Sequence, residues 1–387
     1  MKSSTVFHYS WRGPSAAARF RSGISLHSHT LHSRERLDFL FGILRAWAPL
    51  RWAVHREQLR RQGYSTLPDF SRVWYTPPLG PRQSWEVEAG QIEDHLGLNP
   101  LVSLTDHDAI DAPLALRPLD RTRHVPISLE WTAPFRDTFF HIGVHNLPAA
   151  GLQERFRRML EYTAAPAPET LTEILDALHA SSETLVVLNH PFWDEKGLGP
   201  AMHRVRLFEL LAAQRSRIHA IEVNGLRPWK ENLAAAELAA SWGIPAVAGG
   251  DRHGHEPNAV VNLTRAGTWP EFIDDVRRRK ISDVLYLPAM KESRRVRILG
   301  AICDVVRDNP DHGLGWRRWS DRFFYLCDDG AVRSLSDLWT SGREPALIRN
   351  FVGLMNGLRA SLANGSIRSA LRLALADFGD TAPEVRG

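Results

Sequence analysis

The stretch that decides the fold is Gly23-Ile24-Ser25-Leu26-His27-Ser28-His29, a short apolar run that ends in two histidines one residue apart. A run of this kind is typical of a buried strand in a parallel sheet. Along an extended strand, residues i and i+2 point the same way, so both imidazoles can bind one metal ion. A lone His-x-His pair is weak evidence in a chain with 17 histidines, so other ligands must support it.

The same pattern, an apolar run that ends in a residue able to bind metal, recurs along the chain. Read alone, each such residue is more often a core histidine or a surface acid. Their occurrence one after another is hard to attribute to chance, and it predicts that they converge on a metal centre. They are His107, Glu130, His141, His190 and the i, i+2 pair Asp251 and His253.

Segments with helical spacing of apolar residues lie between many of these runs, at 169–181, 204–214, 231–242 and 270–279. Alternating strands and helices indicate βα units. Roughly seven strands with ligands at their carboxyl ends favour a (β/α) barrel, which places its chemistry at that face. A doubly wound open sheet also alternates, but it does not need ligands from nearly every strand.

An insertion at 38–95 separates the first two strands. The sequence predicts a helix at 37–62 broken near Pro49, a proline-rich loop, and a second helix at 83–96. The insertion is either a lid over the site or an extra packing layer. We expect an N-terminal tail (1–22), a barrel that includes the insertion (23–290) and a mainly helical C-terminal region (291–387).

The composition narrows the class of protein. The chain has 387 residues, 43% of them hydrophobic and 24% charged, which is ordinary for a globular protein and excludes a wholly disordered chain. Cys303 and Cys327 are the only cysteines, which excludes a four-cysteine zinc ribbon and favours a reducing, cytoplasmic location. The net charge of +4 is mild for a dedicated nucleic-acid binder. No apolar run predicts a membrane span.

Taken together, the motifs resemble those of the PHP (polymerase and histidinol phosphatase) family over about residues 23–290, apart from the insertion. The resemblance implies a distorted (β/α)7 barrel that holds two or three divalent metal ions and hydrolyses phosphate esters with a metal-activated water. The matching segments are His27-Ser28-His29-Thr30, Leu104-Thr105-Asp106-His107-Asp108, Glu130, Phe140-His141-Ile142-Gly143, Asn189-His190-Pro191, Ile221-Glu222-Val223-Asn224 and Gly250-Asp251-Arg252-His253.

By position, the resemblance also implies which residues hold each ion. The sets are His27, His29, Glu130 and Asp251 for the first ion, Glu130 as a bridge with His141 and His190 for the second, and His107 with His253 for the third. The third ion needs one more ligand just after the first motif, where the family often has an acid. This chain has Arg34 there, which cannot bind a cation, and Glu35 is the expected substitute.

The ligand types indicate the chemistry. Nitrogen and carboxylate ligands without thiolates suit Mn, Zn or Fe, and two ions about 3.5–4 Å apart can clamp a phosphoryl group. Glu130 and Asp251 are the expected catalytic carboxylates. Arg34 and Arg252, the arginines nearest in sequence to ligands, are the expected contacts to substrate phosphate. Asp106, Asp108 and Glu222 are candidates for orienting the ligands.

The expected substrate is a phosphorylated small molecule or a nucleotide. Nucleic acid is an alternative substrate, because the arginines of the C-terminal region can bind phosphates and its tryptophans can stack on bases. Two other functions compete. An amidohydrolase-type hydrolase also begins with His-x-His, but it would need a lysine where Glu130 fits as the bridge. A non-catalytic, metal-binding regulatory module is the third interpretation, and lost ligands would favour it, but only position 34 departs from the pattern.

Overall fold

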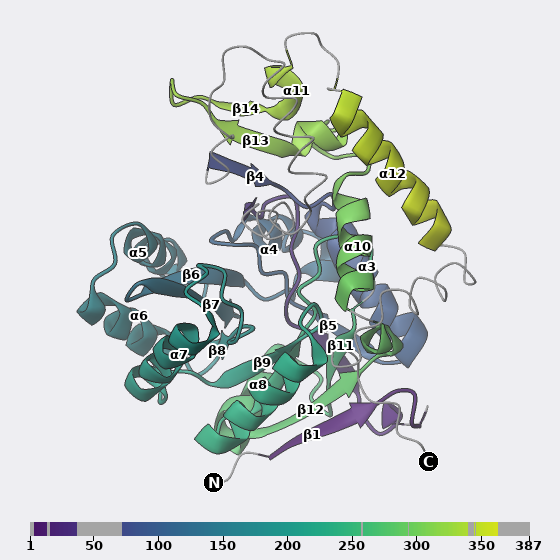
Figure 1. Cartoon of the computed structure of the whole chain (residues 1–387). Coiled ribbons are helices and arrows are strands. Elements are labelled where there is room, and N and C mark those ends of the chain that lie inside the picture. The colour runs from purple at the N-terminus through teal and green to yellow at the C-terminus, as the bar shows by residue number, and fades with distance from the viewer. Residues whose placement is uncertain are drawn as a thin grey trace.

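The computed structural model describes residues 4–13, 16–36, 72–256, 258–292, 294–339, 344 and 346–362. The helix expected at 37–62 lies outside these residues. Two five-stranded sheets form the centre (Figure 1). The first has the order β1 (Ser4–Tyr9), β12 (Ile281–Tyr286), β11 (Val260–Thr264), β2 (Ser22–Ser25) and β5 (Asn99–Val102). The second has the order β10 (Ala246–Gly249), β9 (Ala220–Asn224), β8 (Leu185–Leu188), β7 (Thr138–His145) and β6 (Leu129–Phe135).

The two sheets approach each other at the ends of their strands. Isolated parallel bridges pair Ser28 with Arg252 and His107 with Glu130. These bridges join the extensions of β2 and β10, and the extension of β5 to the start of β6. They bring the ends of several strands, and the residues that follow them, to one place.

The architecture is mixed α/β with several sheets, and no closed barrel forms among the described strands. The distorted (β/α)7 barrel is therefore not confirmed. Strands β8, β9 and β10 are parallel, as expected, but β6, β7 and β8 pair antiparallel. The reason is local: β6 and β7 are joined by the tight turn at Arg136 and Asp137 instead of by a helix, and Arg136 has a φ of 58°.

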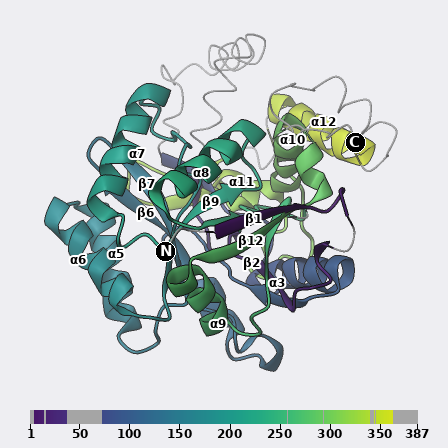
Figure 2. The ribbon, with the colours of Figure 1, turned by 90° about the horizontal axis from the view of Figure 1, so that it is seen from below.

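Helices cover the sheets. They include α5 (Leu152–Ala164), α6 (Pro168–Ala180), α7 (Pro200–Gln214), α8 (Trp229–Trp242) and α9 (Trp269–Asp274), which continues into a π-type turn (Asp275–Arg279). In Figure 2, α5, α6 and α7 lie along one side of the strands and α3 on the opposite side. Helix α6 has the expected apolar face, since Leu171, Ile174, Leu175 and Leu178 are all buried. Its first residue is proline, whose fixed φ suits a helix start.

The expected second helix of the insertion is present. It comprises α3 (Pro81–Gly90) and a π-type turn (Gln91–His95), after which the chain enters β5. A short helix, α4 (Asp111–Leu116), and a 3-10 turn (Asp120–Thr122) follow β5. Helix α3 thus packs directly beside the ligand-bearing strands, where α3 and β5 are in contact.

A smaller four-stranded sheet joins the insertion to the C-terminal region. Its order is β14 (Val332–Ser334), β13 (Phe323–Leu326), β4 (Val73–Tyr75) and β3 (Glu35–Arg36). The helices expected after residue 291 are α10 (Arg294–Val305), α11 (Leu335–Leu338) and α12 (Ala346–Leu362), with 3-10 turns at Pro288–Lys291 and Trp319–Arg322. The hairpin β13–β14 adds strands to the region expected to be mainly helical.

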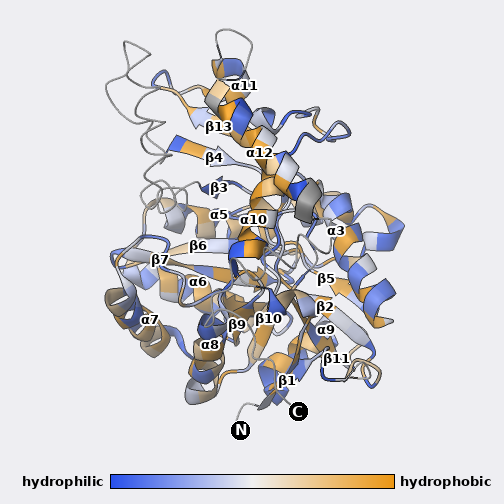
Figure 3. Ribbon diagram, turned by 45° about the vertical axis from the view of Figure 1, so that its right-hand side comes forward, coloured by the Kyte–Doolittle hydropathy of each residue, from blue (hydrophilic) through white to orange (hydrophobic). Residues whose placement is uncertain are grey.

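The small sheet and these helices share one core. It includes Tyr75 from the insertion together with Trp319, Phe323, Val352 and Met355 from the C-terminal region. Figure 3 shows α12 changing between apolar and polar residues along its length, as expected for a helix with one buried face. No described helix is both long enough and apolar enough to cross a lipid bilayer.

Candidate metal centre

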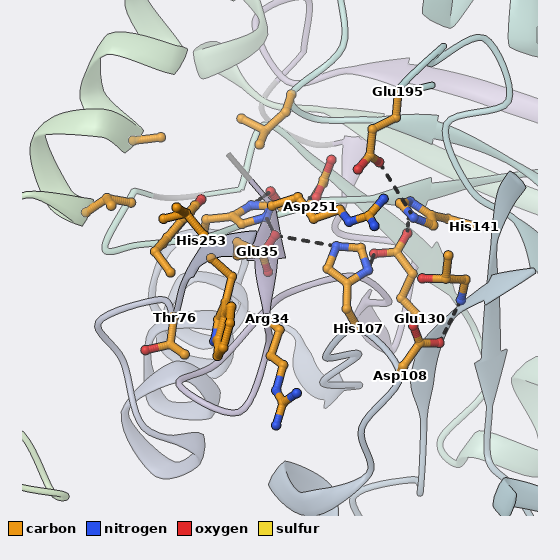
Figure 4. A pocket seen from close by; sticks show the side chains of 18 of the residues that line it. Arg34, Glu35, Thr76, His107, Asp108, Glu130, His141, Glu195, Asp251 and His253 are labelled. Atoms are coloured by element: carbon orange, nitrogen blue, oxygen red, sulfur yellow. Dashed lines mark hydrogen bonds and ion pairs between the residues drawn. The ribbon is translucent and has the colours of Figure 1, made fainter. Parts of the chain in front are cut away.

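The side chains expected to bind metal converge at the ends of the central strands (Figure 4). Glu130, the second residue of β6, lies in the middle and is fully buried. Its Oε2 lies 3.1 Å from Nε2 of His27, and its Oε1 lies 3.0 Å from Nε2 of His190. On the other side, Nδ1 of His107 lies 3.3 Å from Oε2, and Nδ1 of His141 lies 3.6 Å from Oε1. Glu130 therefore has both oxygens among imidazoles, as a bridging carboxylate requires.

Donor atoms in this region form overlapping groups whose members lie within 4.8 Å of one another. The overlap arises because His29 and Glu130 each belong to several groups. The groups are His27, His29 and Glu130; His29, Glu35 and His107; His29, Asp251 and His253; and His107, Glu130 and His141. Because residues are shared between groups, the donor atoms suit a centre that holds more than one cation.

Glu35 stands beside the histidines expected around the third ion. Its Oε2 lies 3.1 Å from Nε2 of His253 and 3.4 Å from Nε2 of His107. The residue is the first of β3 and is 5% exposed. The position one residue after Arg34 thus supplies a carboxylate, as the sequence predicted.

The donor set fits divalent cations. Oε1 of Glu35 is buried and accepts no hydrogen bond from any described residue, which is costly unless a cation satisfies it. Nε2 of His27 lies 3.0 Å from Nε2 of His29, so both nitrogens, when deprotonated, can bind the same cation. Nitrogen and carboxylate ligands without thiolates suit Mn, Zn or Fe. Divalent cations are therefore the group that these residues can hold.

Electrostatics keep the carboxylates ionised. Burial alone raises the pKa of Glu130, yet the nearby His27, His107 and His141 hold that pKa well below its usual range. The pKa values of Glu35 and Asp251 are lowered in the same way. Burial lowers the pKa of His29 to about 4, which leaves its ring neutral and able to bind a cation through a nitrogen lone pair.

Of the three acids expected to orient ligands, Glu222, on β9, contacts ligand residues. Its Oε1 lies 2.7 Å from Nδ1 of His27, and its Oε2 accepts a hydrogen bond from the backbone N–H of His190 at 2.8 Å. A carboxylate in this position fixes the orientation of a ligand ring. Asp106 accepts hydrogen bonds from the backbone N–H and hydroxyl of Thr30, and Asp108 accepts one from the backbone N–H of Thr132, so these two acids hold the backbone near the centre.

The backbone at the centre is unusual. His190, Asp251 and Asp108 have φ values of 24°, 54° and 49°, in the left-handed region that residues with a Cβ rarely adopt. Such conformations persist only where surrounding contacts hold them, and they gather at functional sites. Close packing also demands glycine at Gly249 of β10, where a Cβ would lie 1.6 Å from Oε1 of Glu222.

The two arginines expected to contact phosphate differ in their placement. Arg252 is 3% exposed, and its guanidinium donates hydrogen bonds to Glu88 and Ser84. It is therefore fully engaged, and the expectation that it contacts substrate is not supported. Arg34 is exposed, lies with its Cζ 5.6 Å from the ring centroid of Trp74, and points away from the histidine cluster in Figure 4.

A cavity of about 2260 Å³ opens above the cluster and has Glu130, His141, His190, Asp251 and His253 in its wall. Its remaining wall combines aromatic and basic side chains from the barrel-like part and from the C-terminal region. They include Trp74, Phe139, Trp193, Trp316 and Phe324, and Arg34, Arg36, Lys196, Arg227 and Arg295. The cavity is much larger than a single phosphate needs.

The sequence did not single out three residues of the cavity wall, Trp193, Glu195 and Arg227. Arg227 lies with its Cζ 3.9 Å from the ring centroid of Trp193, and its Nε and Nη1 are buried without a hydrogen-bond acceptor among the described residues. Oε2 of Glu195 lies 3.7 Å from Nε2 of His141, and burial raises the pKa of this carboxyl. All three follow β8 or β9, so the strand-end rule that identified metal ligands also marks them.

Comparisons with known proteins give limited likeness. No family model and no curated protein matches the chain. An amidohydrolase from Chromobacterium violaceum, solved with sulfate and no metal, is 18% identical over 46% of this chain and 84% of its own, with a TM-score of 0.30. A candidate metal-dependent phosphoesterase from Bifidobacterium adolescentis is 19% identical. The match covers 47% of this chain and 85% of the phosphoesterase, with a TM-score of 0.29. PsfC from Pseudomonas syringae is 18% identical. The match covers 48% of this chain and 76% of PsfC, with a TM-score of 0.30.

These likenesses are too weak to establish a family or an activity. The resemblance to the PHP family therefore stays a prediction. The residues of the centre, which form clusters able to bind metal, are the ground on which a function can be inferred.

Proposed function

We propose that the protein is a metal-dependent phosphoesterase that hydrolyses small phosphomonoesters or nucleotides at a centre of two or three divalent cations. The observation that carries this proposal is the convergence of histidines from many strands around the buried carboxylate of Glu130 at the base of a large cavity. One structural ion needs about four ligands, and this cluster has more donors than that.

We also propose that the fold is a PHP-type barrel in which isolated bridges replace full strand ladders at two places. Strands β2, β5, β6, β7, β8, β9 and β10 follow one another through ladders and the two isolated bridges. The support is that His27, His107, His190 and Asp251 lie just beyond the ends of β2, β5, β8 and β10, while Glu130 and His141 project from β6 and β7 towards the same place.

When bound, divalent cations lower the pKa of a coordinated water and neutralise charge on a phosphoryl group. The chain's own residues have distinct tasks. Glu130 and Asp251 keep a negative charge at the centre, because neighbouring histidines lower the pKa of each. Glu222 holds the ring of His27 in place.

Arg227 replaces Arg252 as the residue proposed to bind the substrate phosphate. Arg227 lines the cavity with its Cζ 3.9 Å from the Trp193 ring centroid, and its buried Nε and Nη1 have no acceptor among the described residues, so a phosphate would reach them only if the guanidinium turned towards the cavity. Stacking on an indole face fixes a guanidinium while leaving its edge free to donate hydrogen bonds. A phosphate oxygen is the acceptor that such an edge binds best.

The competing functions have less support. Glu130 occupies the shared position where an amidohydrolase-type centre would need a lysine. A non-catalytic role does not explain why the cavity wall holds Arg227 next to the centre. The aromatic wall keeps a nucleotide or a short nucleic acid among the proposed substrates.

The test is a metal-supplemented activity screen. Protein stripped with a chelator is assayed with p-nitrophenyl phosphate, phosphorylated metabolites, nucleotides and short oligonucleotides, with and without added Mn²⁺, Zn²⁺ or Fe²⁺, and the metal content of the same batch is measured. We expect no turnover after stripping and restored turnover with one of these ions. Full turnover by the stripped protein, or none on any phosphate ester with every ion, would contradict the proposal.

A further inference from the structure

Arg252 lies between the ligands Asp251 and His253, in a segment bound to the first histidine pair. The backbone N–H of His29 donates a hydrogen bond to the carbonyl of Arg252 at 2.9 Å, and the N–H of Asp251 donates one to the carbonyl of His27 at 2.8 Å. The hydrogen bonds of the Arg252 guanidinium show where its side chain lies. With Asp251 facing the centre, the side chain of Arg252 faces away from it, towards α3.

The side chain of Arg252 is clamped by α3. Its Nε donates a hydrogen bond to Oε1 of Glu88 at 2.5 Å, and its Nη2 donates one to Oγ of Ser84 at 2.7 Å. Its Nη1 donates to the carbonyl of Gly254. Glu88 is 1% exposed, and its other oxygen accepts a hydrogen bond from Asn258. All three guanidinium nitrogens are therefore engaged inside the protein.

The two partners on α3 stand four residues apart, so they share one face of the helix. Oγ of Ser84 also lies 3.5 Å from the carbonyl of His29, which links the same helix to the first ligand pair. Asp251 has a φ of 54°, a conformation that needs support from its surroundings. Helix α3 can give this support, since it packs against β5.

We propose that Arg252 is a positioning residue of the metal centre, and that its clamp on Glu88 and Ser84 holds Asp251 and His253 in the arrangement that binds cations. The proposal rests on the metal centre of the proposed function. It assigns α3, at the end of the insertion, a role in metal binding. It also gives a role to Arg252, whose side chain is buried against α3 and not in contact with the candidate ligands.

A buried ion pair that only stabilises the fold would give a different result. Loss of such a pair lowers the melting temperature and leaves the metal affinity of the folded protein unchanged. Loss of a partner that orients ligands typically lowers metal affinity by about 10- to 100-fold. Metal affinity, measured without any assay of activity, separates these roles.

The experiment is calorimetric titration of Mn²⁺ into metal-stripped protein, with the melting temperature measured on each sample. The variants are Arg252→Met, Arg252→Lys and, as a matched control, Arg322→Met. Arg322 is 1% exposed and donates hydrogen bonds to the carbonyls of Val305 and Arg307, away from the centre. We expect Arg252→Met to weaken Mn²⁺ binding at least about tenfold, Arg252→Lys to weaken it less, and Arg322→Met to lower only the melting temperature.

Arg252→Met leaves the carboxylate of Glu88 buried without its partner, which can prevent folding. The double variant Glu88→Leu, Arg252→Met removes both charges and keeps an apolar contact, so it gives a folded protein that lacks the clamp. Wild-type affinity and wild-type ion number in either variant would overturn the inference. Wild-type protein that takes up no Mn²⁺, Zn²⁺ or Fe²⁺ would instead overturn the proposed function, and the two failures are thus distinct.

Discussion

At the scale of single residues, Glu130 has the largest expected effect. Glu130→Gln keeps the size of the side chain but removes the charge that lies among His27, His107 and His141. A direct ligand should cost more than the roughly 10- to 100-fold in metal affinity that loss of an outer partner costs. We expect less than half of the wild-type metal content by elemental analysis and almost no turnover.

The control for this variant is Glu209→Gln, which changes a surface glutamate paired with Arg206. It should keep the metal content and turnover of the wild-type protein. Unchanged metal content in Glu130→Gln would show that Glu130 does not hold the cations.

Arg227 is the residue on which substrate binding should depend. Hydrogen bonds to charged groups contribute about 1.5–3 kcal/mol, so Arg227→Gln should lower kcat/KM for a phosphate ester by about 10- to 100-fold while metal content stays unchanged. Arg204→Gln is the matched control, since Arg204 stacks on the neighbouring Phe192 and is exposed. Equal kcat/KM values for the two variants would remove Arg227 from the proposed site.

The convergence of the candidate ligands was predictable in part, because His27, His107, His190 and Asp251 follow strands, whereas Glu130 and His141 lie within β6 and β7. His27, Glu130 and Asp251 come after apolar runs, and the ends of neighbouring strands meet. Nearness in sequence suggested Arg252 as a phosphate contact but does not say which side a residue faces, and its side chain lies against α3. Arg227 was missed because the same strand-end signal was applied to metal ligands alone.

At the scale of elements, several helices and the strands that precede the candidate ligands were predictable, whereas β1, β11, β12 and the pairing of the strands were not. The apolar face of α6 is readable from spacing. The turn between β6 and β7 has no glycine, so nothing in the sequence marks the antiparallel hairpin that interrupts the barrel pattern. The hairpin β13–β14 does carry an Asp329-Gly330 turn signal. Its pairing with β4 joins residues far apart along the chain, which periodicity does not reveal.

Strand β10 offers a test of how tightly the elements support the centre. In Gly249→Ala, the added methyl group would meet the carboxylate of Glu222, which is already bonded to His27 and the N–H of His190. Overpacking of this kind costs about 1–3 kcal/mol. We expect urea unfolding to show that loss of stability, together with weaker Mn²⁺ binding, because Glu222 must leave His27.

Gly353→Ala is the comparison for this variant. Gly353 lies in α12, and a Cβ there would meet nothing within 4 Å. Alanine should raise the stability of the helix by roughly 0.5–1 kcal/mol. If Gly249→Ala were as stable as the wild type, Glu222 would be free to move, and its role in fixing His27 would be wrong.

At the scale of the whole molecule, the centre joins parts that are distant in sequence. Ligands come from residues 27 to 253, and Glu35 begins the small sheet that the C-terminal region completes. Cations that bind this centre therefore tie both large sheets and the small sheet together. A ligand that binds only the folded state stabilises it, by about 2.7 kcal/mol at 100 times its dissociation constant. The effect should reach the whole chain because the unfolded state has no such centre.

Mn²⁺ should accordingly raise the melting temperature of the stripped protein by several degrees. Mg²⁺ at the same concentration should raise it less, because Mg²⁺ prefers oxygen ligands and this centre is rich in imidazole nitrogens. Differential scanning fluorimetry measures both shifts, and Glu130→Gln should show little response to either ion. Equal shifts with Mn²⁺ and Mg²⁺ in wild type and variant would mean that the ions bind elsewhere on the surface, because a nitrogen-rich centre must distinguish these two cations.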